Sequence, residues 1–258
     1  MEFVIYLITG LLAGVIGGLL GTGGCALMMP VVRFGFHFDP ALAVGTTLTA
    51  VVFTAAAGAY QHIKMKNVDR TTALRIGASG VLGVILGSVA FGYLKDYGRI
   101  IDLIIGVAFI IVALRMLFEG LRGGMPAGQE ATAVPGSTAA KSGLGASIGF
   151  LTGIIGLGGG YALVPSLIYF LGSPVKLAIG TSMAAFVWMA IVGSAFKLYQ
   201  QVVNVPVAVT LGIGAAVGAV FGAKLVARFN PNLLKALFGL LFLYVSLKYL
   251  LLFVDVHI

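Results

Sequence analysis

Residues 10–24 read GLLAGVIGGLLGTGG, and residues 145–159 read GASIGFLTGIIGLGG. A shift of 135 positions superposes the two segments without a gap and aligns most of their glycines. The same register continues well beyond these segments and also pairs Pro30 with Pro165. A register that aligns prolines as well as glycines over such a length is not a chance match. The chain is therefore an internal duplication of one unit.

The composition places this unit in a lipid bilayer. Hydrophobic residues make up 60% of the 258-residue chain and charged residues only 9%, and the mean hydropathy is +1.10. A water-soluble domain needs about a quarter of its residues charged. Apolar runs long enough to cross a bilayer follow one another along the chain. They cover residues 3–36, 41–60, 72–94, 100–118, 143–171, 175–198, 205–227 and 233–254.

These runs predict an all-α polytopic membrane protein of two repeats, residues 1–118 and 142–258, joined by a polar cytoplasmic linker, residues 119–141. Each repeat would hold a Gly-broken or re-entrant first helix and three further spans, about 8–10 membrane segments in all. If the first run is a re-entrant hairpin or two short spans, each repeat crosses an odd number of times and the second repeat is inverted. That topology divides the 16 lysines and arginines more unevenly between the two sides than a parallel arrangement does. The positive-inside rule therefore favours inverted repeats with a periplasmic N-terminus, and the parallel alternative stays open.

The breaks in the two long runs are the candidate binding site. A helix in a bilayer can break only where protein or a water-filled cavity surrounds the break. The helix that resumes offers free N–H groups and the positive end of its dipole, which suit an anion. Paired broken helices are typical of the binding site of a transporter. The candidate residues at the breaks are Gly21, Thr22, Gly23, Gly24, Gly158, Gly159 and Gly160.

The same glycines have a simpler interpretation, which is that they only permit close helix packing. We expect that packing role for the glycines spaced four residues apart, because this spacing places them on one stripe of a helix. The stripes are Gly10, Gly14 and Gly18; Gly145, Gly149 and Gly153; and Gly214, Gly218 and Gly222.

Two further sets of polar residues repeat in both halves. The pairs Thr46-Thr47 and Thr181-Ser182 follow a glycine at the start of a span, and their hydroxyls can donate to an anion or cap a helix. Alternatively, each hydroxyl bonds to its own helix backbone. His62 and Lys197 also superpose, near the ends of these spans. They are candidates for a vestibule that attracts the anion, or for side chains that snorkel to the interface.

Other kinds of function find little support. The single cysteine and three scattered histidines offer no metal site, and no catalytic set or cofactor motif is present. The eight acidic residues lie in loops or near span ends, which argues against a carboxylate relay for cations. The basic residues are spread between the apolar runs and form no patch for nucleic acid. We therefore predict neither an enzyme nor a cofactor.

The chain resembles the TauE/SafE group of membrane proteins. The resemblance rests on the two Gly-rich breaks, each followed by Pro30 or Pro165, on AVGTT (43–47) and AIGTS (178–182), and on the turn NVD (67–69). It implies a bacterial inner-membrane permease that exports sulfite or organosulfonates, with the substrate at the two breaks and the two Gly-Thr entrances. The halves differ in that Cys25 stands where the second half has Gly160.

We therefore expect a multi-pass secondary transporter of the bacterial cytoplasmic (inner) membrane that exports a small sulfur-containing anion such as sulfite. The substrate would bind between the repeats, at the N-termini of the broken helices. One alternative is a permease of the same fold for an organosulfonate or another organic anion, including uptake. Another is a membrane scaffold that transports nothing. The expected partners are the anion and the lipid bilayer, and the sequence is compatible with a homo-oligomer.

Overall fold

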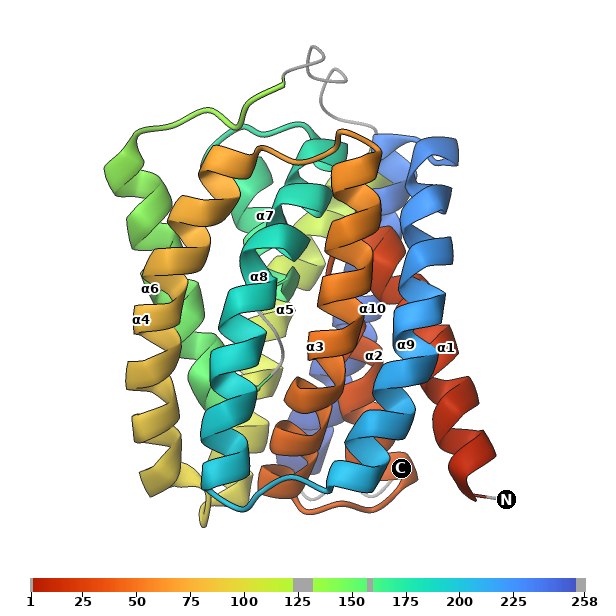
Figure 1. Ribbon diagram of the computed structural model, residues 1–258, viewed down its shortest axis with the longest axis vertical. Helices are drawn as coiled ribbons and strands as arrows, with labels where there is room; N and C mark the ends of the chain where they lie inside the picture. The colour runs from red at the N-terminus through yellow and green to blue at the C-terminus, as the bar shows by residue number, and fades with distance from the viewer. Residues whose placement is uncertain (1, 123–131, 157–159, 254–258) are drawn as a thin grey trace.

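The computed structural model describes residues 2–122, 132–156 and 160–253, and every regular element within these ranges is a helix. Figure 1 shows the helices running side by side along the long axis of the molecule. The first repeat contains α1 (Glu2–Leu20), α2 (Cys25–Pro30), η1 (Val31–Gly35), α3 (Pro40–Lys64), α4 (Arg70–Leu94) and α5 (Gly98–Arg122). The second contains α6 (Thr138–Ile155), α7 (Gly160–Tyr169), α8 (Val175–Tyr199), α9 (Val205–Leu225), η2 (Val226–Arg228) and α10 (Pro231–Phe253).

The helices confirm the prediction of an all-α polytopic membrane protein. Six of them, α1, α3, α4, α8, α9 and α10, are long and apolar enough to cross a membrane. Large apolar side chains also cover the outside of the bundle, as Leu82 (65% exposed) and Leu86 (64% exposed) do on α4. An outer surface of this kind is compatible with a lipid environment and would aggregate in water. The chain is a multi-pass membrane protein.

Local sequence signals set where the helices start. The Asp69 side chain accepts a hydrogen bond from the backbone N–H of Thr72 at the start of α4. The Asn204 side chain does the same for Val207 at the start of α9. Asp69 and Asn204 correspond under the shift of 135 positions, so both repeats use the same N-cap.

Each broken run folds as a hairpin of two helices. In Figure 1, α1 rises from the lower end of the bundle, and α2 and η1 return the chain to that end before α3 begins. The hairpin of α6 and α7 starts and finishes at the upper end. Each run therefore begins and ends at one end of the bundle, which favours the odd number of crossings. The inverted relation of the repeats in a membrane stays a prediction.

The glycine stripes pack helices of one repeat against helices of the other. Helix α1 lies along α9, and α6 lies along α4. A Cβ atom on Gly14 would lie 2.2 Å from the carbonyl oxygen of Ala215, and a Cβ on Gly149 would lie 2.1 Å from that of Gly80. Only glycine allows backbones to approach so closely. The predicted packing role of the stripes is confirmed.

The end of the linker is anchored to the start of α4. The helices extend into both ends of the predicted linker, because α5 continues to Arg122 and α6 begins at Thr138. Asp69 accepts hydrogen bonds from the N–H of Val134 (3.0 Å) and from the hydroxyl of Thr72 (2.6 Å). Lys141 donates to the carbonyl of Val134 (2.6 Å) and to the Thr72 hydroxyl (2.9 Å).

This cluster shifts the acid–base equilibrium of Asp69. Partial burial of the carboxyl group acts to raise its pKa. The hydrogen bonds from Thr72 and Val134 and the charge of Lys141 act in the other direction and outweigh the burial. The pKa of Asp69 therefore lies below its ordinary value, and the carboxylate form is the one that the anchor stabilises.

Candidate functional site

Glycines reverse the chain at the tip of each hairpin. Gly21, Gly23 and Gly24 have φ angles of 74°, 70° and 79°, and Gly156 ends α6 with a φ of 66°. Side chains of L-residues are strained at such angles, whereas glycine is not. The glycine-rich segments are therefore required by the turns themselves, in addition to any contact with a ligand.

The two hairpin tips meet inside the bundle. A Cβ atom on Gly160 would lie 2.3 Å from the carbonyl oxygen of Gly21 and 2.6 Å from the Cα of Thr22. From α8, the hydroxyl of Ser182 lies 3.2 Å from the same Gly21 carbonyl and 2.9 Å from the Ile179 carbonyl of its own helix, and it can donate to either. Thr22 and Ser182 are both fully buried. The structure thus brings together candidate residues from both halves; Gly158 and Gly159 lie outside the described residues.

Thr46 and Thr181 lie at a different kind of contact, which joins the repeats. The Thr46 hydroxyl accepts a hydrogen bond of 2.9 Å from the backbone N–H of Asn204. The Thr181 hydroxyl accepts one of 3.0 Å from the N–H of Asp69. Each threonine therefore supports the loop that precedes a helix of the opposite repeat. These hydroxyls have a structural partner, whether or not they also donate to an anion.

Thr47 follows Thr46 on α3 but has no such partner. It is fully buried, and its hydroxyl makes no hydrogen bond within the described part of the chain. Its equivalent in the second half, Ser182, points its hydroxyl at the tip of the first hairpin. A buried hydroxyl without a partner is costly, so Thr47 is the candidate whose donor is available to a bound solute.

His62 and Lys197 both lie inside the bundle, because each side chain is fully buried. The Nε2 atom of His62 lies 3.0 Å from the carbonyl oxygen of Gly18, in the last turn of α1. The Nζ atom of Lys197 donates to the carbonyl of Gly153, in the last turn of α6, at 2.8 Å. Each residue thus bonds a carbonyl that the broken helix leaves without a backbone donor. Neither faces water as a vestibule residue would.

The family profile described as "Sulfite exporter TauE/SafE" matches residues 6–249 of the chain. The chain belongs to the TauE/SafE family. Its relatives include the probable membrane transporter protein YunE of Bacillus subtilis (strain 168), which is 27% identical, with 90% of each chain covered. A probable membrane transporter protein of Xylella fastidiosa (strain 9a5c) is 30% identical over 93% of this chain and 91% of its own. No solved structure matches the chain.

The match confirms the resemblance that the breaks and the Gly-Thr pairs indicate. Membership of TauE/SafE covers both repeats, since the match extends from the first hairpin into α10. The relatives are named as transporters across a membrane. This TauE/SafE protein is accordingly a membrane transporter by family.

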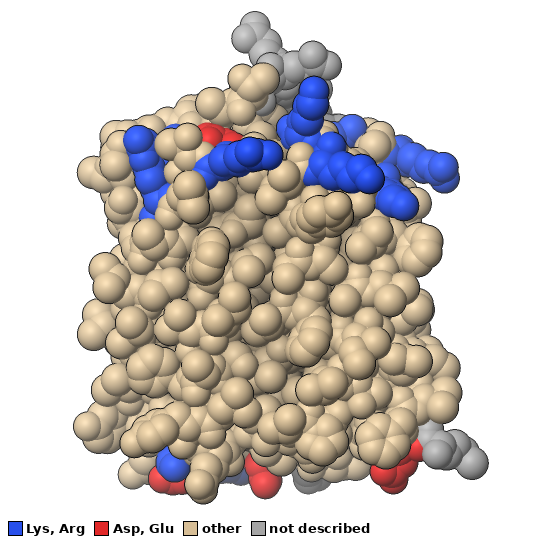
Figure 2. Space-filling view, in the orientation of Figure 1, with Lys and Arg blue, Asp and Glu red and all other residues tan. Residues whose placement is uncertain are grey.

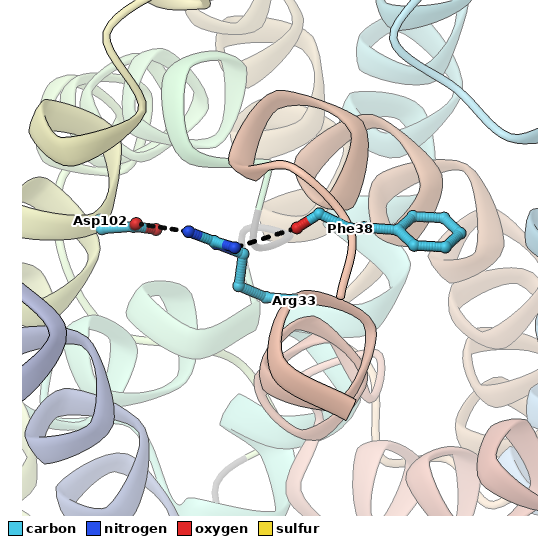
Figure 3. Close-up of polar contacts among 3 residues, drawn as sticks. All are labelled: Arg33, Phe38 and Asp102. Atoms are coloured by element: carbon cyan, nitrogen blue, oxygen red, sulfur yellow. Dashed lines mark hydrogen bonds and ion pairs between the residues drawn. The ribbon is translucent and has the colours of Figure 1, made fainter. Parts of the chain in front are cut away.

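One buried ion pair of this TauE/SafE protein was not predicted from its sequence. Figure 3 shows Arg33 of η1 between Asp102 of α5 and the backbone carbonyl of Phe38. The guanidinium lies 3.2 Å from the Asp102 carboxylate and donates to the Phe38 carbonyl at 3.1 Å. Asp102 is only 2% exposed. The pair ties the returning arm of the first hairpin to α5 and to the loop before α3.

The sequence does contain a signal for this pair. Arg33 interrupts the apolar run 3–36, and Asp102 lies just inside the run 100–118. A charge inside an apolar run needs a partner in the same layer of the bilayer. Two opposite charges of this kind within one repeat are therefore candidates for an ion pair, and the packing of η1 on α5 decides the pairing.

Proposed function

We propose that this protein is a secondary transporter that exports a small sulfur-containing anion, such as sulfite, across the cytoplasmic membrane. The substrate binds between the two repeats, where the broken helices begin. The observation that carries the proposal is the buried contact of the two hairpin tips, in which Gly160 lies against Gly21 and Thr22. A site built from both repeats at broken helices is typical of secondary transporters.

The chemistry of the tips suits an oxyanion. Two helical segments begin there, Cys25–Gly35 and Gly160–Tyr169. The first N–H groups of a helix have no carbonyl partner within the helix, and the positive end of the dipole lies beside them. Glycines at the tips leave these N–H groups accessible to a small solute. The Ser182 hydroxyl beside them donates to the carbonyls of Gly21 and Ile179, so it holds the tip in place and the backbone N–H groups are the donors for a solute.

Because the tips are buried, transport requires a movement within the protein. Thr22 and Ser182 are fully buried, so an anion held beside them is closed off from both ends of the bundle. Transport then requires one hairpin, or one repeat, to move relative to the other. The glycine stripes that pack α1 on α9 and α6 on α4 form flat backbone contacts along which helices can slide.

The choice of sulfite rests on the description of the family as sulfite exporters. The alternative is a permease of the same fold that exports or takes up an organosulfonate or another organic anion. The names of the relatives specify no substrate. A scaffold without transport would have no use for two helix breaks that meet at one buried point.

The test is solute flux into and out of proteoliposomes that contain the purified protein. Sulfite, thiosulfate, sulfate and taurine are compared side by side, with empty liposomes as the blank. We expect protein-dependent flux of sulfite above that of the other three anions. Equal rates with and without protein for all four would refute anion transport, and a preference for taurine would establish the organosulfonate alternative.

A variant at the tip contact connects the flux to the proposed site. Gly160→Ala places a methyl group against the Gly21 carbonyl and should abolish sulfite flux. Gly143→Ala on α6 is the matched control, because a Cβ atom there meets nothing within 4 Å. Ser182→Ala is a gentler second variant at the same contact, in case Gly160→Ala fails to fold as judged by melting in detergent.

A further inference from the structure

Lys197 is a buried basic residue whose partners carry no full negative charge. It is completely buried near the end of α8. Its ammonium donates to the Gly153 carbonyl at 2.8 Å and lies 3.1 Å from the centroid of the Phe91 ring. Among the described residues, no carboxylate lies within ion-pair distance of Lys197. The ion pair that these residues do form joins Arg33 and Asp102. One carbonyl and one aromatic face offset only part of the cost of burying a charge.

A second polar group with unused capacity lies at the same place. Ser88 of α4 is fully buried, and its hydroxyl has no partner in the ranges that the structure describes. The Ser88 backbone nitrogen would lie 2.6 Å from a Cβ atom on Gly153. Ser88 and Lys197 therefore both contact Gly153, from α4 and α8, which pack beside α6 and are neighbours in Figure 1. A hydroxyl and an amine from residues that contact the same glycine are donors of the kind that an oxyanion needs.

The need to cap α6 does not explain this arrangement. In the first half, His62 bonds the equivalent carbonyl of Gly18 at 3.0 Å, so a neutral imidazole N–H is enough for that contact. Under the shift of 135 positions, Ser88 corresponds to Ala223 and Phe91 to Val226. The free hydroxyl and the aromatic ring are thus found in one half alone, at positions where the other half is apolar, and the lysine stands where the other half has a histidine.

We propose that Lys197 and Ser88 form an anion subsite beside the second hairpin tip, in which the lysine is the positive charge that neutralises the transported oxyanion. Gly153 is three residues before Gly156, where α6 ends, so an anion that passes the second tip meets this pair. The ammonium supplies the charge and the Ser88 hydroxyl a directional hydrogen bond. This inference deepens the proposed function and rests on it, because it assigns the anion's charge to one residue.

The test uses the full-length protein in detergent, with gluconate as the only other anion. The readout is the sulfite concentration that gives half of the maximal rise in melting temperature, followed by sulfite flux in proteoliposomes. Lys197→Gln removes the charge but keeps an N–H donor for Gly153, whereas Lys197→Arg keeps the charge. Ser88→Ala removes the hydroxyl, and Ser79→Ala on the same helix, whose hydroxyl bonds the Arg75 carbonyl, is the matched control.

We expect Lys197→Gln to need about ten to a hundred times more sulfite than the wild type for half of the maximal rise in melting temperature. Ser88→Ala should show a smaller loss, and Lys197→Arg and Ser79→Ala should stay close to the wild type. If Lys197→Gln and Ser88→Ala bind sulfite as the wild type does, the subsite is refuted while the proposed function stands. If the wild type itself shows no stabilisation by sulfite, thiosulfate, sulfate or taurine, both fail together. If Lys197→Gln does not fold, Ser88→Ala is compared with Ser79→Ala. Equal sulfite binding by these two variants refutes the subsite, and weaker binding by Ser88→Ala supports it.

Discussion

At the scale of single residues, two adjacent threonines have different roles because different atoms lie opposite them. The hydroxyl of Thr46 is the acceptor for the N–H of Asn204, 158 residues further along the chain. The hydroxyl of Thr47 is buried without a partner in the described structure. Removing the first hydroxyl leaves a partly buried N–H without its partner, whereas removing the second leaves no donor or acceptor behind. The two residues therefore contribute oppositely to stability.

Thr46→Val and Thr47→Val make this difference measurable. Thr46→Val should lower the free energy of unfolding by about 0.5–1.5 kcal/mol, the net contribution of one such hydrogen bond. Thr47→Val should leave the melting temperature unchanged or raise it, because it removes a polar group that is buried without a hydrogen bond. If the Thr47 hydroxyl donates to the anion, Thr47→Val should also weaken sulfite binding by roughly 5- to 150-fold.

The measurement is thermal melting in detergent with and without sulfite. Thr181→Val is the matched variant of the other half and should behave as Thr46→Val does, because its hydroxyl accepts from the N–H of Asp69. A Thr47→Val protein that melts below Thr46→Val would contradict the assignment of both residues.

At the scale of elements, a small number of polar contacts holds the starts of α4 and α9 in place. The anchor of Asp69, Thr72, Val134 and Lys141 fixes the end of the linker to α4. The second repeat has no equivalent, because the position that corresponds to Thr72 is Val207. The anchor therefore ties Val134, at the described end of the linker, to α4, and the charge of Asp69 is central to it.

The anchor predicts a pH dependence of stability. The pKa of Asp69 is below its ordinary value of 3.8 in the folded protein. Its contribution is therefore fully present above that ordinary value and is lost as the pH falls through the lower folded-state value. We expect Asp69→Asn to melt below the wild type at pH 7, by about 2–4 °C for each kcal/mol lost. The difference should shrink as the pH falls below about 4.

Melting curves of both proteins in detergent between neutral pH and pH 3 provide the measurement. Asp39→Asn is the control, because Asp39 precedes α3 but its side chain makes no capping bond; it should follow the wild type throughout. If the difference in melting temperature between Asp69→Asn and the wild type stays constant or widens on acidification, the carboxylate is not the stabilising form.

At the scale of the whole molecule, charge is distributed unevenly between the two ends of the bundle. Figure 2 shows the lysines and arginines of this face gathered mostly at the upper end, and most of the visible acidic residues at the lower end. In Figure 1, α5 and α6 meet the linker at the upper end, and both termini lie at the lower end. The positive-inside rule therefore predicts that the upper end faces the cytoplasm.

Reporter tags test this topology in intact cells. A tag inserted between Glu119 and Lys141 should report a cytoplasmic location, and tags at the N-terminus and C-terminus should report the periplasm. The physical reason is the uneven distribution of the 16 lysines and arginines. Finding the linker and the C-terminus on the same side would rule out an odd number of crossings and make the repeats parallel.

The sequence by itself determined the membrane location, the duplication, the spans and the two helix breaks. These features are set locally, since lipid selects apolar runs of a given length and only glycine tolerates the backbone angles of the tips. The ends of α3, α4 and α8 accordingly lie within a few residues of the predicted runs. The glycine stripes were also predictable, because their spacing places them on one face of a helix.

Only the tertiary structure decided which polar residues are available to a solute. Thr46 and Thr47 have the same chemistry, and the sequence could not distinguish them, because the difference lies in the partner from the opposite repeat. His62 and Lys197 are near span ends in the sequence but are buried against the ends of α1 and α6. The pairing of Arg33 with Asp102 likewise depends on how η1 packs on α5. In each case the deciding contact joins segments far apart in the chain, and local pattern carries no information about its geometry.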